Sequence, residues 1–290
     1  MHVFDMILHK VYFKGYKRVI IFLVILFFTF IYFDSNAMAA GFILGGDDEM
    51  VIVIDPGHGG EQEGAQFEYD GVMIDEKDLD LSIAINLRNE LLGYEHVRVV
   101  MTRESDITIG LKERADIAMR EGADYFISVH CNAEGEDEES LKNPTGAMII
   151  VPYGKYQPAM SVSPNVNLAS ELLGKSVLDN LCEYGLGIAR DFGTMNNNGI
   201  VKRPYSKEGW AKATKYYPDN SVTDYYGQMR FNMEYGIPAI LIEHAYMSDE
   251  GEYRKYLESE ESRKALAVVD AKGIANALKL VPTSENTEND

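Results

Sequence analysis

The chain has few of the residues that would indicate a disulfide framework or a nucleic-acid surface. Its 290 residues include 2 cysteines, and 27 lysines and arginines stand against 46 aspartates and glutamates, for a net charge of −19. Cys131 and Cys182 are too few for a disulfide framework, and we predict two buried free thiols. The acidic surplus repels phosphate backbones, which argues against nucleic acid as a partner. The His-Glu-x-x-His pattern is also absent, which argues against a zinc site carried by one helix.

Long apolar runs are confined to the N-terminus. Val19–Phe33 is an almost unbroken apolar run, with basic residues between positions 10 and 18 and an Ala-x-Ala ending at Ala39. This arrangement is typical of a secretory signal peptide, so we predict one over residues 1–39 and an exported protein, extracellular or in the cell wall. The run is short for a membrane span. The alternative is an uncleaved anchor that tethers the protein to the membrane.

Beyond a short linker at 40–50, buried-strand patterns alternate with helix patterns. The predicted strands cover 51–54, 97–101, 124–130, 146–151 and 238–242. The predicted helices cover 76–93, 111–120, 167–182 and 263–278. This alternation is typical of an α/β layered fold, and we assign residues 51–280 to one domain.

One long segment, 183–236, interrupts the alternation. It is polar, glycine-rich and dense in tyrosine, and it contains the chain's one tryptophan, Trp210. Loops of this length in a compact domain are usually functional or disordered. The aromatic content favours an ordered wall of a substrate groove over a lid. We predict that the tail, 281–290, is disordered.

Four polar side chains stand where predicted elements begin or end. His58 follows the first strand, Glu76 begins a helix, and His130 and Glu243 each end a strand. Ligands of open α/β sheets bind at the carboxyl ends of the strands. Two histidines and a carboxylate can hold a catalytic zinc ion, and a second carboxylate can move protons. The residue types alone leave ordinary roles open, such as a glutamate that complements the helix dipole.

The motifs around these residues resemble a known family. Val51–Ile54 followed by Asp-Pro-Gly-His-Gly-Gly resembles the first motif of the zinc-dependent N-acetylmuramoyl-L-alanine amidases, the amidase-3 family of peptidoglycan hydrolases. Further resemblances follow in the family's order at 76–78, 111–133 and 238–249. Together they span about two thirds of the chain.

The resemblance implies a three-layer α/β sandwich with a mixed, mostly parallel central sheet and a single zinc site at the strand C-terminal ends. It implies that His58, Glu76 and His130 bind Zn²⁺ and that Glu243 is the catalytic acid/base. The substrate would be peptidoglycan, cut at the amide between N-acetylmuramic acid and L-alanine, and we expect a monomer. The alternatives are another exported zinc peptidase or deacetylase, or a cell-wall-binding module of the same fold without turnover.

The chain departs from the family pattern just after Glu243. His244 and Ala245 stand where the family has an apolar residue and a glycine. Side chains alternate along a strand, so His244 points to the face opposite Glu243. We therefore expect His244 to support the structure behind the site.

Overall fold

The computed structural model describes residues 49–134, 145–189, 196–206 and 213–283. The predicted signal peptide, Trp210 and most of the predicted linker and tail lie outside the described residues, so these predictions stay predictions. Within the described ranges, every helix is too short or too polar to cross a lipid bilayer.

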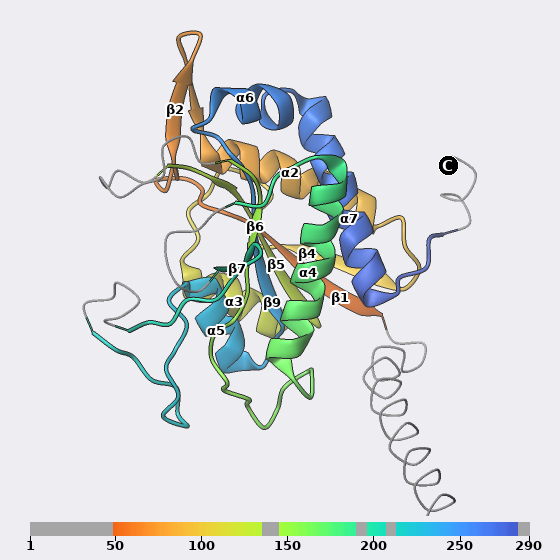
Figure 1. Ribbon diagram of the computed structural model, residues 1–290. Helices are drawn as coiled ribbons and strands as arrows, with labels where there is room; N and C mark the ends of the chain where they lie inside the picture. The colour runs from red at the N-terminus through yellow and green to blue at the C-terminus, as the bar shows by residue number, and fades with distance from the viewer. Residues whose placement is uncertain (1–48, 135–144, 190–195, 207–212, 284–290) are drawn as a thin grey trace, which may run out of the picture. The chain divides into compact units, whose positions relative to one another are not determined.

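A mixed sheet forms the centre of the described fold (Figure 1). The strand order is β4 (Val97–Met101), β1 (Met50–Pro56), β5 (Tyr125–Asn132), β9 (Ala239–Tyr246), β6 (Met148–Ile150), β8 (Ile200–Val201) and β7 (Asn196–Asn197). The first four strands are parallel, β6 is antiparallel to β9, and β8 is parallel to β6 and antiparallel to β7. The β-branched run of β1 is buried on both faces, as parallel strands in α/β proteins are.

Helices cover both faces of this sheet and make three layers. One face packs against α2 (Glu76–Leu91), α4 (Val166–Tyr184) and α7 (Glu260–Leu278), and the other against α3 (Leu111–Glu121) and α5 (Gly227–Tyr235). Alternate residues of β1 divide between the two cores: Ile52 and Ile54 belong to the first, and Val53 belongs to the second. A short segment, α6 (Glu250–Glu252) with a π-helical turn at Tyr253–Leu257, connects β9 to α7.

The predicted three-layer α/β fold with a mostly parallel sheet is confirmed. Each strand and helix predicted from the sequence contains an element of that type. Helix ends are set where glycine takes a left-handed conformation, as at Gly122 after α3, with φ of 68°. Cys131 and Cys182 are both free, but Cys182 is half-buried, so its predicted full burial was wrong.

Three sets of elements were not predicted, among them α6 with the π-helical turn that follows it. A hairpin, β2 (Gln66–Tyr69) and β3 (Val72–Asp75), precedes α2, and its turn residues Asp70 and Gly71 both have positive φ. An Asp-Gly pair is a hairpin signal that could have predicted it. The segment 183–236, described from the sequence as one long loop, contains β7, β8 and α5. The helix α5 escaped prediction because it buries polar Gln228 and Asn232, which weakens its apolar pattern.

Candidate metal centre

The turn after β1 presents His58 at the carboxyl edge of the sheet. His58 has a backbone φ of 55°, in the left-handed region, and Gly59 follows at 120°. Gly57 has no room for a side chain, because a Cβ there would lie 2.3 Å from His130 Cε1 and 2.5 Å from Asp80 Oδ2. Glycine therefore lets this turn approach β5 and α2 closely enough for their side chains to meet His58.

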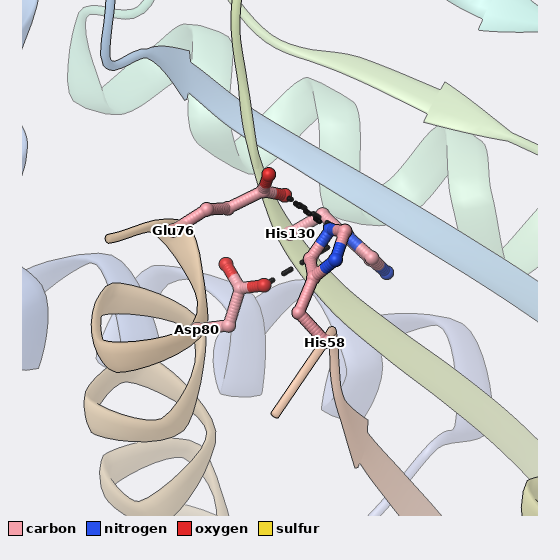
Figure 2. Close-up of side chains that lie close together, drawn as sticks. All are labelled: His58, Glu76, Asp80 and His130. Atoms are coloured by element: carbon pink, nitrogen blue, oxygen red, sulfur yellow. Dashed lines mark hydrogen bonds and ion pairs between the residues drawn. The ribbon is translucent and has the colours of Figure 1, made fainter. Parts of the chain in front are cut away.

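Four side chains from three elements converge at this edge (Figure 2). Glu76 Oε1 lies 3.2 Å from His58 Nε2 and 3.1 Å from His130 Nδ1. Asp80, one turn further along α2, places Oδ2 3.8 Å from His130 Nδ1. Ligand atoms of all four residues lie within 4.8 Å of one another. The structure thus brings the three predicted ligands together and adds Asp80, which the sequence did not single out.

The donor set fits a divalent cation. Atoms bonded to zinc at about 2.0–2.1 Å in a tetrahedron lie about 3.3 Å apart. The 3.1 and 3.2 Å separations around Glu76 Oε1 are close to this value. Both carboxylate oxygens of Asp80 and Nε2 of His130 are buried and have no hydrogen-bond partner among the described residues. Buried polar atoms are normally paired, so the cluster has unused capacity to bind a cation.

The electrostatics of the cluster also favour a cation. Burial would raise the pKa of Glu76, but hydrogen bonds from His130 and His58 lower it to about 2. Burial and the charges of Glu76 and Glu243 hold the pKa of Asp80 well above its usual range. Burial and the charge of Glu76 do the same to the pKa of Glu243. A bound dication would relieve this repulsion between neighbouring carboxylates.

Glu243 faces this cluster and His244 faces away. Glu243 lies directly beside His130 in the register of β9 and β5, and both line one cavity. His244 is fully buried on the other face, with Nε2 2.7 Å from Asp270 Oδ2 and Nδ1 3.0 Å from the carbonyl oxygen of His130. The predicted opposite orientation of Glu243 and His244 is confirmed, and His244 contacts the backbone of β5 behind the site.

Two buried arginines hold the turn that carries His58. Arg114 pairs with Asp55 at 2.7 Å and donates to the carbonyl oxygens of Pro56 and His58 at 2.6 and 2.5 Å. Arg103 donates to the carbonyl oxygen of Gly57 at 2.6 Å. Sequence reasoning assigned these residues no role. The sequence feature that could have indicated a role for Arg114 is its position in the third motif, on a helix predicted to pack on the sheet.

The cluster opens into a cavity of about 790 Å³. His58, Glu76, His130 and Glu243 line one part of it. Another part is lined by side chains from the segment 203–230: Tyr205, Lys215, Tyr225, Tyr226, Gln228 and Arg230. This size is within the range of pockets that bury a small-molecule ligand or a short peptide.

Comparison with known families identifies the chain. The family model Amidase_3, described as N-acetylmuramoyl-L-alanine amidase, matches residues 52–276. The chain belongs to this family. The resemblance to the amidase-3 family inferred from the sequence motifs is therefore confirmed.

Curated relatives and solved structures agree with this assignment. The chain is 28% identical to the N-acetylmuramoyl-L-alanine amidase AmiC of Escherichia coli over 73% of its own length, and 30% identical to AmiB of Haemophilus influenzae over 78%. It covers 49% and 51% of those two proteins, so it spans about half of their length. A crystal structure of an N-acetylmuramoyl-L-alanine amidase from Clostridium difficile superposes with a TM-score of 0.56 and 25% identity, covering 80% of this chain and 98% of that one.

Proposed function

We propose that this Amidase_3 protein is a zinc-dependent N-acetylmuramoyl-L-alanine amidase that cuts peptidoglycan between N-acetylmuramic acid and L-alanine. One observation supports this above all. His58, Glu76 and His130 converge within bonding reach of one ion, and Glu243 faces the same cavity from the neighbouring strand. We assign the three converging residues as zinc ligands and Glu243 as the catalytic acid/base.

The arrangement accounts for amide hydrolysis. A bound zinc ion would lower the pKa of a water ligand and polarise the scissile carbonyl. Glu243 would accept the proton of the attacking water and deliver it to the departing alanine nitrogen. An amide nitrogen leaves readily only when protonated. Glu243 lines the same cavity as the cluster, so its carboxylate is placed to take up and release a proton there.

Asp80 and the buried arginines would maintain this geometry. Asp80 Oδ2 lies 3.8 Å from Nδ1 of His130, the ring nitrogen that also approaches Glu76, so its carboxylate would add negative charge beside the ion. Arg103 and Arg114 hold three successive backbone carbonyls of the turn that ends at His58. A ligand turn held in this way needs little reorganisation when the ion binds.

The setting of this activity follows from the substrate. Peptidoglycan lies outside the cytoplasmic membrane, so we propose export directed by residues 1–39, either cleaved as a signal peptide or retained as a membrane tether. We propose that segment 183–236 forms a wall of the substrate groove, because Tyr205, Tyr225 and α5 line the cavity next to the cluster. The protein would act as a monomer.

Digestion of purified peptidoglycan tests the reaction. The products are separated and identified by mass spectrometry, with metal-depleted and zinc-restored protein in parallel. We expect peptides with a free L-alanine amine and glycan strands with intact lactyl-muramic acid. Activity should vanish with a chelator and return with zinc.

Other outcomes would contradict the proposal. Cleavage within the stem peptide would identify a peptidase, and released acetate would identify a deacetylase. Binding to the wall without any product would identify a non-catalytic module. Full activity after metal removal would exclude zinc from the mechanism.

A further inference from the structure

The cavity wall opposite the metal cluster collects positive charge on a strongly acidic protein. The chain carries a net charge of −19, yet Lys215 and Arg230 line the cavity together. Both cations lie against one aromatic ring: Lys215 Nζ is 4.3 Å and Arg230 Cζ is 5.6 Å from the ring centroid of Tyr205. Two cations that contact the same ring in one cavity give that part of the wall a positive potential, which favours an anionic ligand there.

Among the residues that the structure describes, neither of these two cations forms an ion pair, as is also true of several lysines elsewhere on the surface. Across the described residues, most lysines and arginines at the surface pair with a carboxylate, as Arg88 does with Glu104 and Lys202 with Glu171. No ion pair within the described ranges involves Lys215 or Arg230. Their charge is therefore available to a ligand.

The carboxylate of Asp224, a residue whose backbone Arg230 contacts, is already hydrogen-bonded by other donors. Its carboxylate accepts a hydrogen bond from the hydroxyl of Tyr217 at 2.7 Å and another from the backbone N–H of Tyr153. Arg230 reaches only the backbone carbonyl of Asp224, at 3.4 Å. Burial raises the pKa of Asp224 to about 6 despite these donors. Asp224 thus interacts with Arg230 through its charge, but among the described residues it forms no ion pair with the guanidinium.

Backbone hydrogen bonds hold the main chain of Tyr205 and Lys215 in place beside each other. The N–H of Lys215 donates to the carbonyl oxygen of Tyr205 at 3.1 Å, and the N–H of Tyr205 donates to that of Thr223 at 2.7 Å. Thr223 in turn donates to the carbonyl oxygen of Lys215 at 2.9 Å. Arg230 is supplied separately by α5. Pre-positioned donors lose less entropy on binding a ligand than free surface side chains do.

We propose that Lys215 and Arg230, arranged on the ring of Tyr205, form a carboxylate subsite that binds a free carboxylate of the stem peptide. This inference rests on the proposed amidase function, which places the scissile amide at the metal cluster and the peptide along the same cavity. The stem peptide carries a free carboxylate near the cleaved bond, on the isoglutamate that follows L-alanine, unless that group is amidated. An ammonium and a guanidinium discriminate between a carboxylate and its neutral amide mainly by charge.

A pair of substrates that differ only in this charge tests the subsite. The substrates are N-acetylmuramoyl-L-alanyl-D-isoglutamate and its isoglutamine counterpart. We expect kcat/KM to be about tenfold to a hundredfold higher for the acid, as loss of a charge-assisted hydrogen bond predicts. The difference should lie in KM, because the contact is the same in the ground and transition states.

Three variants locate the effect. Lys215→Gln and Arg230→Gln should each reduce the preference for the acid, and the double variant should remove it. Lys264→Gln is the control, because Lys264 is an exposed cation on α7, which covers the other face of the sheet. The control should keep the wild-type preference.

A binding measurement separates this inference from the proposed function. Calorimetric titration with the product dipeptide L-alanyl-D-isoglutamate, its isoglutamine form and inorganic phosphate needs no turnover. We expect the acid to bind tightest and the double variant to lose that advantage. Equal binding of acid and amide, or phosphate binding as strong as the acid, would overturn the subsite even if the amidase activity is present. Absence of hydrolysis together with selective dipeptide binding would instead overturn the proposed function.

Discussion

Arg114 offers the sharpest test of how the fold holds the metal centre. Its guanidinium is buried against Asp55, which has no exposed side-chain surface, at 2.7 Å. It also donates to the backbone carbonyl oxygens of Ile109, Pro56 and His58. Replacing Arg114 with leucine would leave a buried carboxylate without its counter-charge and would remove one donor from each of three backbone carbonyls, of which that of Pro56 keeps its hydrogen bond from Arg103.

The size of the effect follows from these contacts. Removing one partner of a buried ion pair lowers the free energy of unfolding by about 3–5 kcal/mol, because the remaining charge stays desolvated. Each orphaned carbonyl could add about 1–3 kcal/mol, but relaxation and water entry make such costs less than additive. We therefore expect Arg114→Leu to lower the free energy of unfolding by about 3–5 kcal/mol. This is a large part of the total stability of about 5–15 kcal/mol of a typical domain.

The assay is urea unfolding of metal-free protein, followed by circular dichroism, together with zinc affinity from competition with a chelator. Arg114→Lys should fall between wild type and Arg114→Leu, because an ammonium keeps the charge but cannot reach all four acceptors. Arg88→Leu is the matched control. It removes an exposed pair with Glu104 and should leave the stability nearly unchanged.

One result would refute the reasoning. If Arg114→Leu unfolded within about 1 kcal/mol of wild type, in the range of an ordinary substitution, the buried pair would not be what holds the turn after β1. A folded Arg114→Leu protein should also bind zinc about 10- to 100-fold more weakly, since the carbonyl of His58 loses its anchor. Unchanged zinc affinity would show that Arg114 does not contribute to zinc binding.

Three further predictions concern the cluster itself. Glu243→Gln should lower kcat by about 10²- to 10⁴-fold while zinc stays bound, and full turnover on muropeptides would exclude it as the acid/base. Gly57→Ala should weaken zinc binding in chelator competition, because its Cβ would lie 2.3 Å from His130 Cε1; wild-type affinity would show that the turn can move away. In metal-free protein, the raised pKa values of Asp80 and Glu243 mean that the folded state holds protons that the unfolded state has released. The free energy of unfolding should therefore fall as the pH rises above about 4, the ordinary carboxyl pKa. In Asp80→Asn, urea unfolding at several pH values should show a smaller dependence of this free energy on pH. An unchanged dependence would count against this cause.

The local sequence determined most of the regular structure. The β-branched run of β1 is apolar on both faces, so it reads as a buried parallel strand without further context. The apolar spacing of α2 and the left-handed glycine after α3 likewise predict helices and their ends. The hairpin β2–β3 was not predicted because its strands are short. The helix α5 was not predicted because its buried positions are partly polar.

The sequence also determined which polar residues stand at element ends, and its motifs linked His58, Glu76, His130 and Glu243 to one family. Alternation along β9 placed Glu243 and His244 on opposite faces, and the family motif then selected Glu243. What alternation could not show is which atoms each side chain contacts. The pairing of His244 with Asp270 depends on how α7 lies over the sheet.

Only the tertiary structure decided the remaining parts of the site. Asp80 joins the cluster because α2 packs against the turn after β1, and Arg114 reaches Asp55 across 59 residues because α3 packs on the other face. Lys215 and Arg230 contact one tyrosine ring although Lys215 lies in a loop and Arg230 lies on α5. Periodicity along a chain reports which face of an element is buried. It carries no information on which distant element supplies the neighbour, since strand order and helix packing set that.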